Sequence, residues 1–398
     1  MSLNCSGILL RHSGMRIESQ QKRRHVIALL ARHVRTALGE KNIPVTKVRT
    51  MNGQIFVETP ESTAAARVAS RVFGVVSASP VAATPADMHQ ILEVGLTMAR
   101  DTFGKNLAFA VRVKQVDIDS LSSQDISEKL SEHILEGLPE LKLRVDSMTP
   151  DWTIFVEVID DWAYLLTETI KGVAGMPTGF QGKVVCTISS GLDSPVAAYK
   201  VMKRGCVPVF VHFDNAPFSD ESNKELAIRQ AKHLAEYIYD NEVKMYIVPH
   251  GNDLVEVLKH APRKMTCIFC RRNMYRLARQ VAISEDADAI VTGEIIGEQA
   301  SQTSRNLRAE TGAVCDVLIL RPCIGTDKVE IERQAMEIGT YDFAREAVSC
   351  CILPPKHPSV YARLEDVIAA ESKMDFDWVE EEFSRAEVLI LRRSGRHD

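Results

Sequence analysis

Along the first 80 residues, apolar positions recur with the spacing of a helix in some stretches and with the spacing of a strand in others. Residues 20–39 place Val26, Leu30 and Val34 on one side of an amphipathic helix. The other predicted elements are a strand at 8–11, two strands joined by Asn52 and Gly53, a helix at 62–74 and a strand at 75–81. The order strand–helix–strand–strand–helix–strand predicts a ferredoxin-like domain over residues 1–80.

A second mixed segment covers residues 81–175. It contains a predicted helix at 87–102, a strand at 107–117, a helix at 122–138 and two strands within 153–169. Arg112 and Lys114 fall on one face of the first of these strands because side chains alternate with a period of two. The Gly- and Pro-rich residues 172–182 predict a linker.

Short apolar runs alternate with helical segments after residue 183. The predicted strands are 183–188, 207–213, 244–250, 288–293 and 317–322, and the predicted helices are 195–204, 221–238, 253–260, 270–284 and 327–338. This α/β pattern indicates a parallel sheet covered by helices on both faces. Ligands of such sheets bind outside the carboxyl ends of the strands.

Composition and charge narrow the class of protein. The chain has 398 residues, 45% of them hydrophobic and 25% charged, and no apolar run that predicts a membrane span. We therefore expect a cytoplasmic protein without a membrane partner. The net charge is −5, yet residues 1–50 hold ten Lys and Arg against two acids. A basic arm of this kind favours a nucleic-acid partner, and a merely solvated basic face is the alternative.

A loop of small residues, Ser189-Ser190-Gly191-Leu192-Asp193-Ser194, lies between the strand at 183–188 and the next helix. Backbone N–H groups and the positive end of a helix dipole are offered to an anion at such a junction. The Walker pattern G-x-x-x-x-G-K-[ST] is absent. An ordinary turn in which Ser or Asp caps the helix is the alternative.

The loop resembles the SGGxDS pyrophosphate loop of the PP-loop ATPases, which cleave ATP between the α- and β-phosphates. Residues 190–205 resemble the version found in tRNA 4-thiouridine synthetases of the ThiI type. Four further stretches match that family in order, at 211–221, 271–278, 291–303 and 321–342. The resemblance implies a ferredoxin-like domain (1–80), a THUMP RNA-binding domain (81–175) and a PP-loop domain (176–398). Ser190 departs from the family pattern because glycine usually stands there.

The resemblance also implies a set of site residues. The adenylate is expected against Thr187, Ile188, His212, Phe213, Arg271, Gly293 and Gln302, with Ser189, Gly191 and Ser194 in the loop itself. Asp193 is expected to position Mg²⁺ with the pyrophosphate. Lys328 is expected to neutralise charge on the leaving pyrophosphate, and a surface lysine is the alternative for it.

Two pairs of cysteines are candidates for sulfur chemistry. Cys267 and Cys270 have C-x-x-C spacing just before a predicted helix, and Cys350 and Cys351 follow later. The spacing alone is compatible with zinc, a redox pair or an iron–sulfur site. Because the chain has no room for the rhodanese domain of longer family members, the resemblance favours an iron–sulfur cluster on Cys267, Cys270 and Cys351. A persulfide or disulfide relay is one alternative, and inert cysteines or a zinc site is the other. The remaining cysteines are expected in the core: Cys5, Cys186, Cys206, Cys315 and Cys323.

The function implied is ATP-dependent tRNA sulfur transfer. ATP would adenylate the C4 oxygen of a tRNA uridine, at position eight in the family, and sulfur would then replace that oxygen to give 4-thiouridine. The expected partners are tRNA, a sulfur donor (sulfide or a persulfide-carrying protein) and a second copy of the chain in a homodimer. Three alternatives are 2-thiolation of tRNA, sulfur transfer to a carrier in thiamine biosynthesis, and tRNA binding without catalysis.

Overall fold

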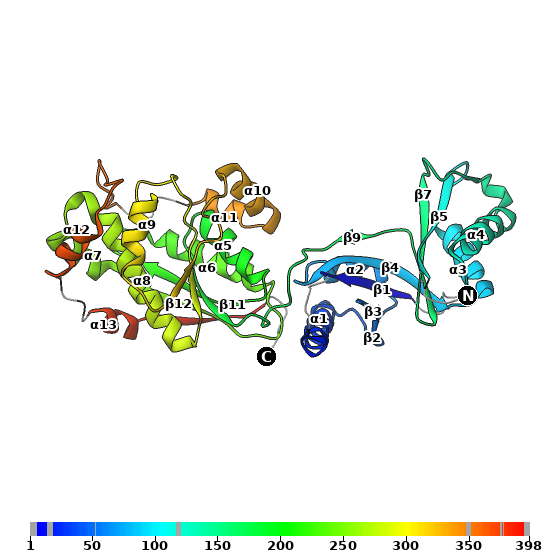
Figure 1. The fold of residues 1–398 in the computed structure, drawn as a ribbon, viewed down its shortest axis with the longest axis horizontal. Coiled ribbons are helices and arrows are strands. Elements are labelled where there is room, and N and C mark those ends of the chain that lie inside the picture. Colours follow the sequence, from blue (N-terminus) through cyan, green and yellow to red (C-terminus); the bar gives the residue numbers. More distant parts are fainter. Residues whose placement is uncertain are drawn as a thin grey trace. The chain divides into compact units, whose positions relative to one another are not determined.

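The computed structural model describes residues 6–13, 19–51, 53–116, 121–347, 352–374, 376 and 378–393. The chain forms two compact units, Met1–Pro177 and Thr178–Asp398 (Figure 1). No helix among the described residues is long and apolar enough to cross a membrane. The predicted turn residue Asn52 lies outside the described residues.

The first unit is built on one sheet with helices packed against it. Its elements are β1 (Ser6–His12), α1 (Gln20–Gly39), β2 (Lys47–Met51), β3 (Gln54–Glu58), α2 (Ser62–Ala69), β4 (Val75–Pro85), α3 (Met88–Thr102), β5 (Ala108–Val116), α4 (Ser123–Gly137), β6 (Arg144–Val145), β7 (Trp152–Ile159), β8 (Trp162–Leu166) and β9 (Ile170–Lys171). The strand order is β2-β3-β1-β4-β8-β7-β5-β6, and β9 pairs with β4.

Strand β4 belongs to both halves of this sheet. It pairs with β1 from Val75 to Ala82 and with β8 from Ala82 to Pro85. The sequence predicted only a strand at 75–81, whereas the apolar run continues through Ala83 and is buried. The helix predicted at 62–74 is also shorter, because α2 ends at Ala69 and the following turn buries Val72 and Phe73.

The second unit contains β10 (Lys183–Thr187), α5 (Asp193–Met202), β11 (Val207–Asp214), α6 (Glu221–Ala235), β12 (Val243–Pro249), α7 (Gly251–His260), α8 (Thr266–Glu285), β13 (Ala289–Val291), α9 (Ser304–Thr311), β14 (Leu318–Leu320), α10 (Lys328–Ile338), α11 (Tyr341–Arg345), α12 (Leu364–Glu371), α13 (Trp378–Ser384) and β15 (Glu387–Leu391). The strand order is β14-β13-β10-β11-β12-β15. The first five strands of this order are parallel, and β15 is an antiparallel edge strand that the sequence pattern did not predict.

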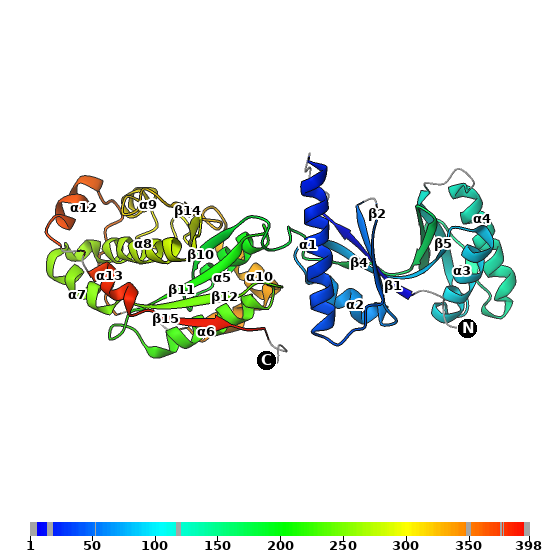
Figure 2. The same ribbon diagram turned by 90° about the horizontal axis from the view of Figure 1, so that it is seen from below.

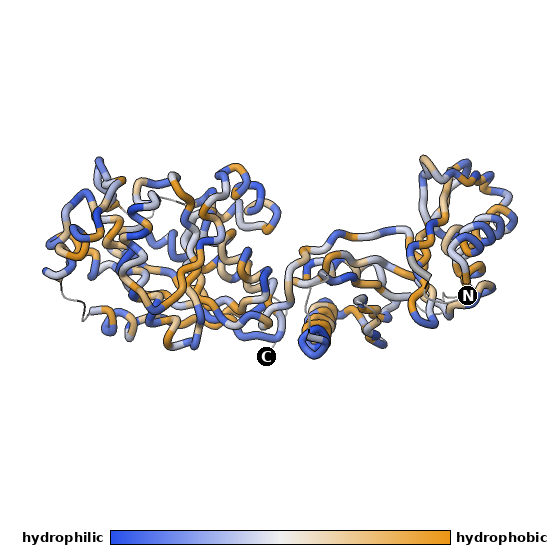
Figure 3. The backbone as a smooth tube through the Cα atoms, viewed as in Figure 1, coloured by the Kyte–Doolittle hydropathy of each residue, from blue (hydrophilic) through white to orange (hydrophobic). Residues whose placement is uncertain are grey.

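Helices cover both faces of this sheet. Figure 2 shows α8 on one side of the strands and α6 on the other. Apolar side chains of α8, such as Leu277 and Val281, pack on Val185 and Val209 of the central strands, and all four are almost fully buried. The hydrophobic residues of the central strands stand out in Figure 3. Burial on both faces explains why these strands are nearly continuous apolar runs in the sequence.

Candidate functional site

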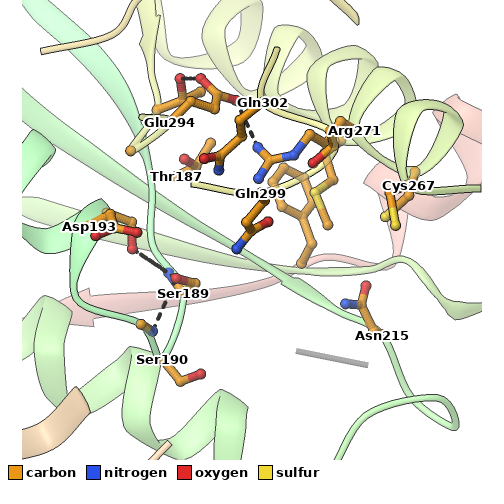
Figure 4. Close-up of a pocket in the computed structure, with 18 of the residues that line it drawn as sticks. Thr187, Ser189, Ser190, Asp193, Asn215, Cys267, Arg271, Glu294, Gln299 and Gln302 are labelled. Atoms are coloured by element: carbon orange, nitrogen blue, oxygen red, sulfur yellow. Dashed lines mark hydrogen bonds and ion pairs between the residues drawn. The ribbon is translucent and has the colours of Figure 1, made fainter. Parts of the chain in front are cut away.

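The carboxyl ends of β10, β11 and β13 open on a cavity of about 730 Å³ (Figure 4). Every residue predicted to contact the adenylate lines it: Thr187, Ile188, Ser189, Gly191, Ser194, His212, Phe213, Arg271, Gly293 and Gln302. Asp193, Cys267 and Cys270 line the same cavity. The structure therefore brings the predicted anion loop and the C-x-x-C cysteines together.

The loop at 189–194 is fixed by side chains on both flanks. The Ser194 hydroxyl oxygen accepts from the Ser189 N–H at 2.9 Å, and the Ser189 hydroxyl oxygen accepts from the Gly191 N–H at 3.2 Å. Gln230 on α6 donates to the carbonyls of Ser189 and Gly191 at 3.1 and 3.2 Å. Because these carbonyls are bound to α6, they are not directed at an anion in the cavity. The sequence analysis did not identify Gln230, because its position within a helix does not indicate that its side chain binds the loop carbonyls.

The hydroxyl of Ser190 has a partner inside the protein. It donates to Oδ1 of Asn223 at 2.6 Å, and both side chains are buried. The extra hydroxymethyl relative to the family pattern is thus directed at α6.

Two glycines of the site differ in whether the surrounding protein leaves room for a side chain. A Cβ at Gly293 would lie 2.7 Å from the Ser194 nitrogen and 2.8 Å from the Asp193 carbonyl carbon, so this position needs glycine for the segment after β13 to approach α5. A Cβ at Gly191 would meet only the Ser189 hydroxyl, at 3.5 Å. The protein itself therefore accommodates a side chain at residue 191.

Asp193 and Lys328 form an ion pair at the first residues of α5 and α10. Nζ of Lys328 lies 2.6 Å from Oδ1 of Asp193, although 135 residues separate them. Lys328 does not line the main cavity. It lines a smaller one of about 380 Å³, formed by residues 295–298 and 324–328. The ion pair thus joins the walls of the two cavities.

Arg271 is held by a buried carboxylate that the sequence analysis missed. Its Nη1 donates to Oε1 of Glu294 at 2.7 Å, and Glu294 also accepts from Tyr275 at 2.5 Å and from Arg321 at 3.0 Å. Burial raises the pKa of Glu294, but Arg271, the hydroxyls of Thr292 and Tyr275, and Arg321 together outweigh it, so the net pKa lies below the usual range. An ionised Glu294 fixes the guanidinium at the cavity wall. Glu294 comes next to Gly293, three residues past the last residue of β13, and this position is the one sequence feature that could have indicated it.

The cysteines are placed differently from the prediction. Helix α8 begins at Thr266, so Cys267 and Cys270 lie in its first turns and not before the helix. Residues 262–266 form a turn that extends the helix backward, with Thr266 donating to the Arg263 carbonyl at 2.8 Å. Cys351, Cys350 and Cys5 lie outside the described residues. Within the described part of the chain, no group of three His, Cys, Asp or Glu side chains could hold a metal ion. Cys186, Cys206 and Cys323 are buried as expected, whereas Cys315 is exposed, which corrects the prediction.

The chain is similar to known proteins along nearly its whole length. Family sequence models for the ThiI ferredoxin-like domain, the THUMP domain and the thiamine biosynthesis protein ThiI match residues 7–79, 85–168 and 179–376. Probable tRNA sulfurtransferases of Methanosarcina mazei and Methanothermobacter thermautotrophicus are 34% and 36% identical to it, covering 96% and 94% of this chain and 95% of each relative. The chain belongs to the ThiI family of tRNA sulfurtransferases.

Solved structures agree with this family assignment. A 4-thiouridine synthetase crystallised with RNA and bound ATP has a TM-score of 0.86 and 26% identity, covering 98% of this chain and 100% of that chain. PH1313 of Pyrococcus horikoshii has a TM-score of 0.63 and 23% identity over 84% of this chain and 99% of that chain, a likeness of fold. The family resemblance seen in the loop and the predicted fold class are both confirmed.

Proposed function

We propose that this ThiI-family protein is an ATP-dependent tRNA sulfurtransferase that converts a uridine, at position eight of tRNA, into 4-thiouridine. The observation that carries the proposal is the single cavity lined by both the 189–194 loop and the C-x-x-C cysteines. The relative crystallised with RNA and ATP supports both substrates. We also propose that the chain divides into domains at 1–80, 81–175 and 176–398. The first two would hold tRNA, and the third would carry out the chemistry.

The first chemical step is adenylation. The uridine C4 oxygen attacks the α-phosphorus of ATP, pyrophosphate leaves, and the uracil N3 proton is lost. In our proposal the loop and Arg271 hold the phosphates, and the segment ends at Thr187, Phe213 and Gly293 hold the adenylate. Asp193 would hold Mg²⁺ with the pyrophosphate, and Lys328 beside it would neutralise the leaving group.

The second step replaces the activated oxygen. A hydrosulfide sulfur attacks C4, the C4–O bond breaks, AMP leaves, and the hydrosulfide proton passes to N3, which gives the thiocarbonyl. Cys267, Cys270 and Cys351 would hold an iron–sulfur cluster, which would supply a soft binding site for sulfide. Ala347 and Pro354, on either side of the segment with Cys351, line the cavity, which supports including that residue. The physiological donor is sulfide or a persulfide-carrying protein.

The first unit offers a surface for RNA. Helix α1 exposes Arg23, Arg24, Arg32 and Arg35 to solvent. Such a cluster binds phosphates without reading sequence. We propose that the protein acts in the cytoplasm as a homodimer. Sedimentation of the purified protein tests the dimer.

Nucleoside mass spectrometry tests the proposed function. Unmodified tRNA incubated with the protein, ATP and sulfide should yield 4-thiouridine at position eight. A 2-thiolated nucleoside would favour 2-thiolation of tRNA as the function. Labelled sulfur on a carrier protein would favour sulfur transfer in thiamine biosynthesis. RNA binding without pyrophosphate release would indicate a non-catalytic tRNA-binding protein.

Iron and sulfide analysis after anaerobic purification tests the cluster. The wild type should contain both, and Cys267→Ala should lose them while retaining pyrophosphate release. Active protein without iron would favour the persulfide or disulfide relay.

A further inference from the structure

Arg305 and Tyr361 form an exposed pair on the second unit. Cζ of Arg305, on α9, lies 4.2 Å from the centre of the Tyr361 ring, which is the spacing of a cation–π contact. Both residues are exposed, and Tyr361 keeps 54% of its surface accessible although the guanidinium covers one face of the ring. The pair therefore leaves aromatic surface on which a second planar group can stack.

Hydrogen bonds of Asn306 place this pair at the rim of the main cavity. The Asn306 side chain is completely buried, and its nitrogen donates to the carbonyls of Ala300 and Ser359, both at 2.8 Å. Ala300 lines the cavity, and so does Pro358, the residue before Ser359. Tyr361 itself does not line the cavity. Because it is exposed and follows Ser359 closely in the chain, its ring lies at the edge of the opening.

The backbone on both sides of Tyr361 is fixed. The Thr303 hydroxyl, at the start of α9, donates to the Val360 carbonyl at 2.9 Å. The Ala362 N–H donates to Oδ1 of Asn306 at 2.9 Å, and the Ala362 side chain belongs to a buried cluster shared with α9 and α12. The ring is thus held in position before a partner arrives, which lowers the ordering cost of binding.

Positive charge gathers around the pair although the second unit is acidic as a whole. Residues 178–398 hold 28 Lys and Arg against 33 Asp and Glu. The Ser359 N–H donates to the Lys264 carbonyl at 2.7 Å, so the turn before α8 lies beside the segment that carries Tyr361. This turn and this segment contribute four further exposed cations, Arg263, Lys264, Lys356 and Arg363.

These cations have charge to offer a partner. Among the described residues, no carboxylate forms an ion pair with any of the four or with Arg305. The exposed acids of the same segment are Glu365 and Asp366, at the start of α12, so the cations outnumber the acids. The surface therefore suits a partner that carries negative charges and planar groups together, which is the composition of RNA.

An unpaired strand of RNA fits this surface better than a duplex. The bases of a duplex are stacked on each other, whereas the bases of an opened strand can stack on an aromatic ring while cations hold the phosphates. On the proposed function, on which this inference rests, the target uridine occupies the cavity, so the nucleotides that adjoin it must cross the rim. We propose that Tyr361 and Arg305 form a stacking platform for a base next to the target uridine, and that the surrounding cations hold the phosphates of that strand.

The platform gives a uridine of a folded tRNA a means of reaching the cavity. A base that is taken out of its stack loses stacking energy, and its neighbours lose part of theirs. Stacking of a neighbouring base on Tyr361 offsets part of this loss, and it does so only in the bound state. The platform therefore stabilises the opened strand without reading its sequence. Tyr361 is thus a positioning residue for the target uridine.

The test is the affinity of full-length protein for an intact tRNA transcript and for two abasic transcripts, each lacking the base on one side of the target uridine. The wild type should bind one of the abasic transcripts about tenfold more weakly than the intact one, which is the loss of one stacked base. Tyr361→Leu, which removes the ring but keeps an apolar side chain, should bind the intact transcript about tenfold more weakly and that abasic transcript no more weakly still. Tyr361→Phe keeps the ring and should behave as the wild type.

The arginine of the pair has its own variant. Arg305→Gln should also weaken binding of the intact transcript, and it should flatten the salt dependence because fewer counterions are released. Tyr341→Leu changes a half-buried tyrosine of α11 that does not line the cavity. It is the matched control and should bind all three transcripts as the wild type does.

The outcomes separate this inference from the proposed function. If Tyr361→Leu binds the intact transcript as tightly as the wild type, or loses as much affinity as the wild type when the base is removed, the ring does not meet a base and the platform is wrong. If Arg305→Gln keeps its tRNA affinity but loses binding to poly-glutamate, the surface fits an acidic protein and the inference fails. If the wild type forms no 4-thiouridine although the ring and the neighbouring base are coupled, the proposed function is wrong and the platform remains as an RNA site. Tyr361→Gln takes the place of Tyr361→Leu if the melting temperature of the latter falls.

Discussion

Ser190 and Glu310 show how much a single side chain of the second unit can depend on its neighbours. The Ser190 hydroxyl is bonded to Asn223, so it stabilises the loop from the side of α6. Glu310 is fully buried, and neither oxygen of its carboxyl group makes a hydrogen bond to any described residue. Each residue leads to a prediction that its sequence position alone would not suggest.

For Ser190→Gly, which restores the family pattern, we expect a loss of about 1 kcal/mol in unfolding free energy, the usual net value of one hydrogen bond. ATP affinity should change less than twofold, because the hydroxyl bonds to protein. Denaturant titration and equilibrium ATP binding measure the two effects. A large gain in ATP affinity would show that the hydroxyl obstructs the phosphate.

For Glu310, burial raises the pKa to about 8, with Arg271 opposing and Glu294 adding to the shift. The folded state therefore binds a proton that the unfolded state releases near its ordinary pKa of 4.5. Stability from this group is full below that pH and is lost as the pH rises toward about 8. Glu310→Gln should raise the melting temperature at pH 8 by several degrees and change it little at pH 5. The exposed Glu365→Gln is the control, and an equal effect at both pH values would contradict the assignment.

At the scale of elements, the approach of the segment after β13 to α5 builds the anion-binding end of the cavity. Gly293→Ala places a Cβ against backbone atoms of Asp193 and Ser194. We expect it to lower the unfolding free energy by about 1–3 kcal/mol and to weaken ATP binding. Gly325→Ala, where a Cβ meets no atom within 4 Å, is the matched control.

Gly191→Ala tests whether a bound phosphate contacts residue 191, because the added Cβ fits among the protein atoms. It should leave the melting temperature unchanged and weaken ATP binding at least tenfold if a phosphate lies against residue 191. Isothermal calorimetry measures this, and unchanged affinity would exclude phosphate contact at that position.

On the scale of the whole molecule, the two units should contribute separable functions. Arg23→Glu together with Arg24→Glu should weaken tRNA binding at low salt and flatten its salt dependence, because fewer counterions are released. ATP binding should persist. Asp193→Ala should show the opposite pattern, with pyrophosphate release abolished and tRNA binding near normal. Filter binding at several salt concentrations and a pyrophosphate assay compare them, with Lys232→Glu at an exposed position of α6 as the charge control. Similar losses of tRNA binding in both variants would contradict separate roles.

Local sequence determined the elements and the loop of this protein. The strand–loop–helix at 183–202 and the amphipathic helix at 20–39 were predicted because periodicity and small residues act within a few positions of each other. The strand–helix alternation also indicated that ligands bind at the carboxyl ends of the strands. Residues of the stretches at 211–221, 271–278 and 291–303 line one cavity there, whereas Lys328 of the stretch at 321–342 lines the smaller one.

Tertiary structure alone decided which distant side chains support that cavity. Glu294 on Arg271, Gln230 on the loop and His250 on Asn215 are contacts between separate elements. The double pairing of β4 and the edge strand β15 were decided in the same way, through partners far along the chain. Periodicity indicates only whether a position is buried. It does not indicate which polar group of another element the side chain at that position contacts. The sequence therefore determined where chemistry is placed, and the packed fold decided how each group there is oriented and charged.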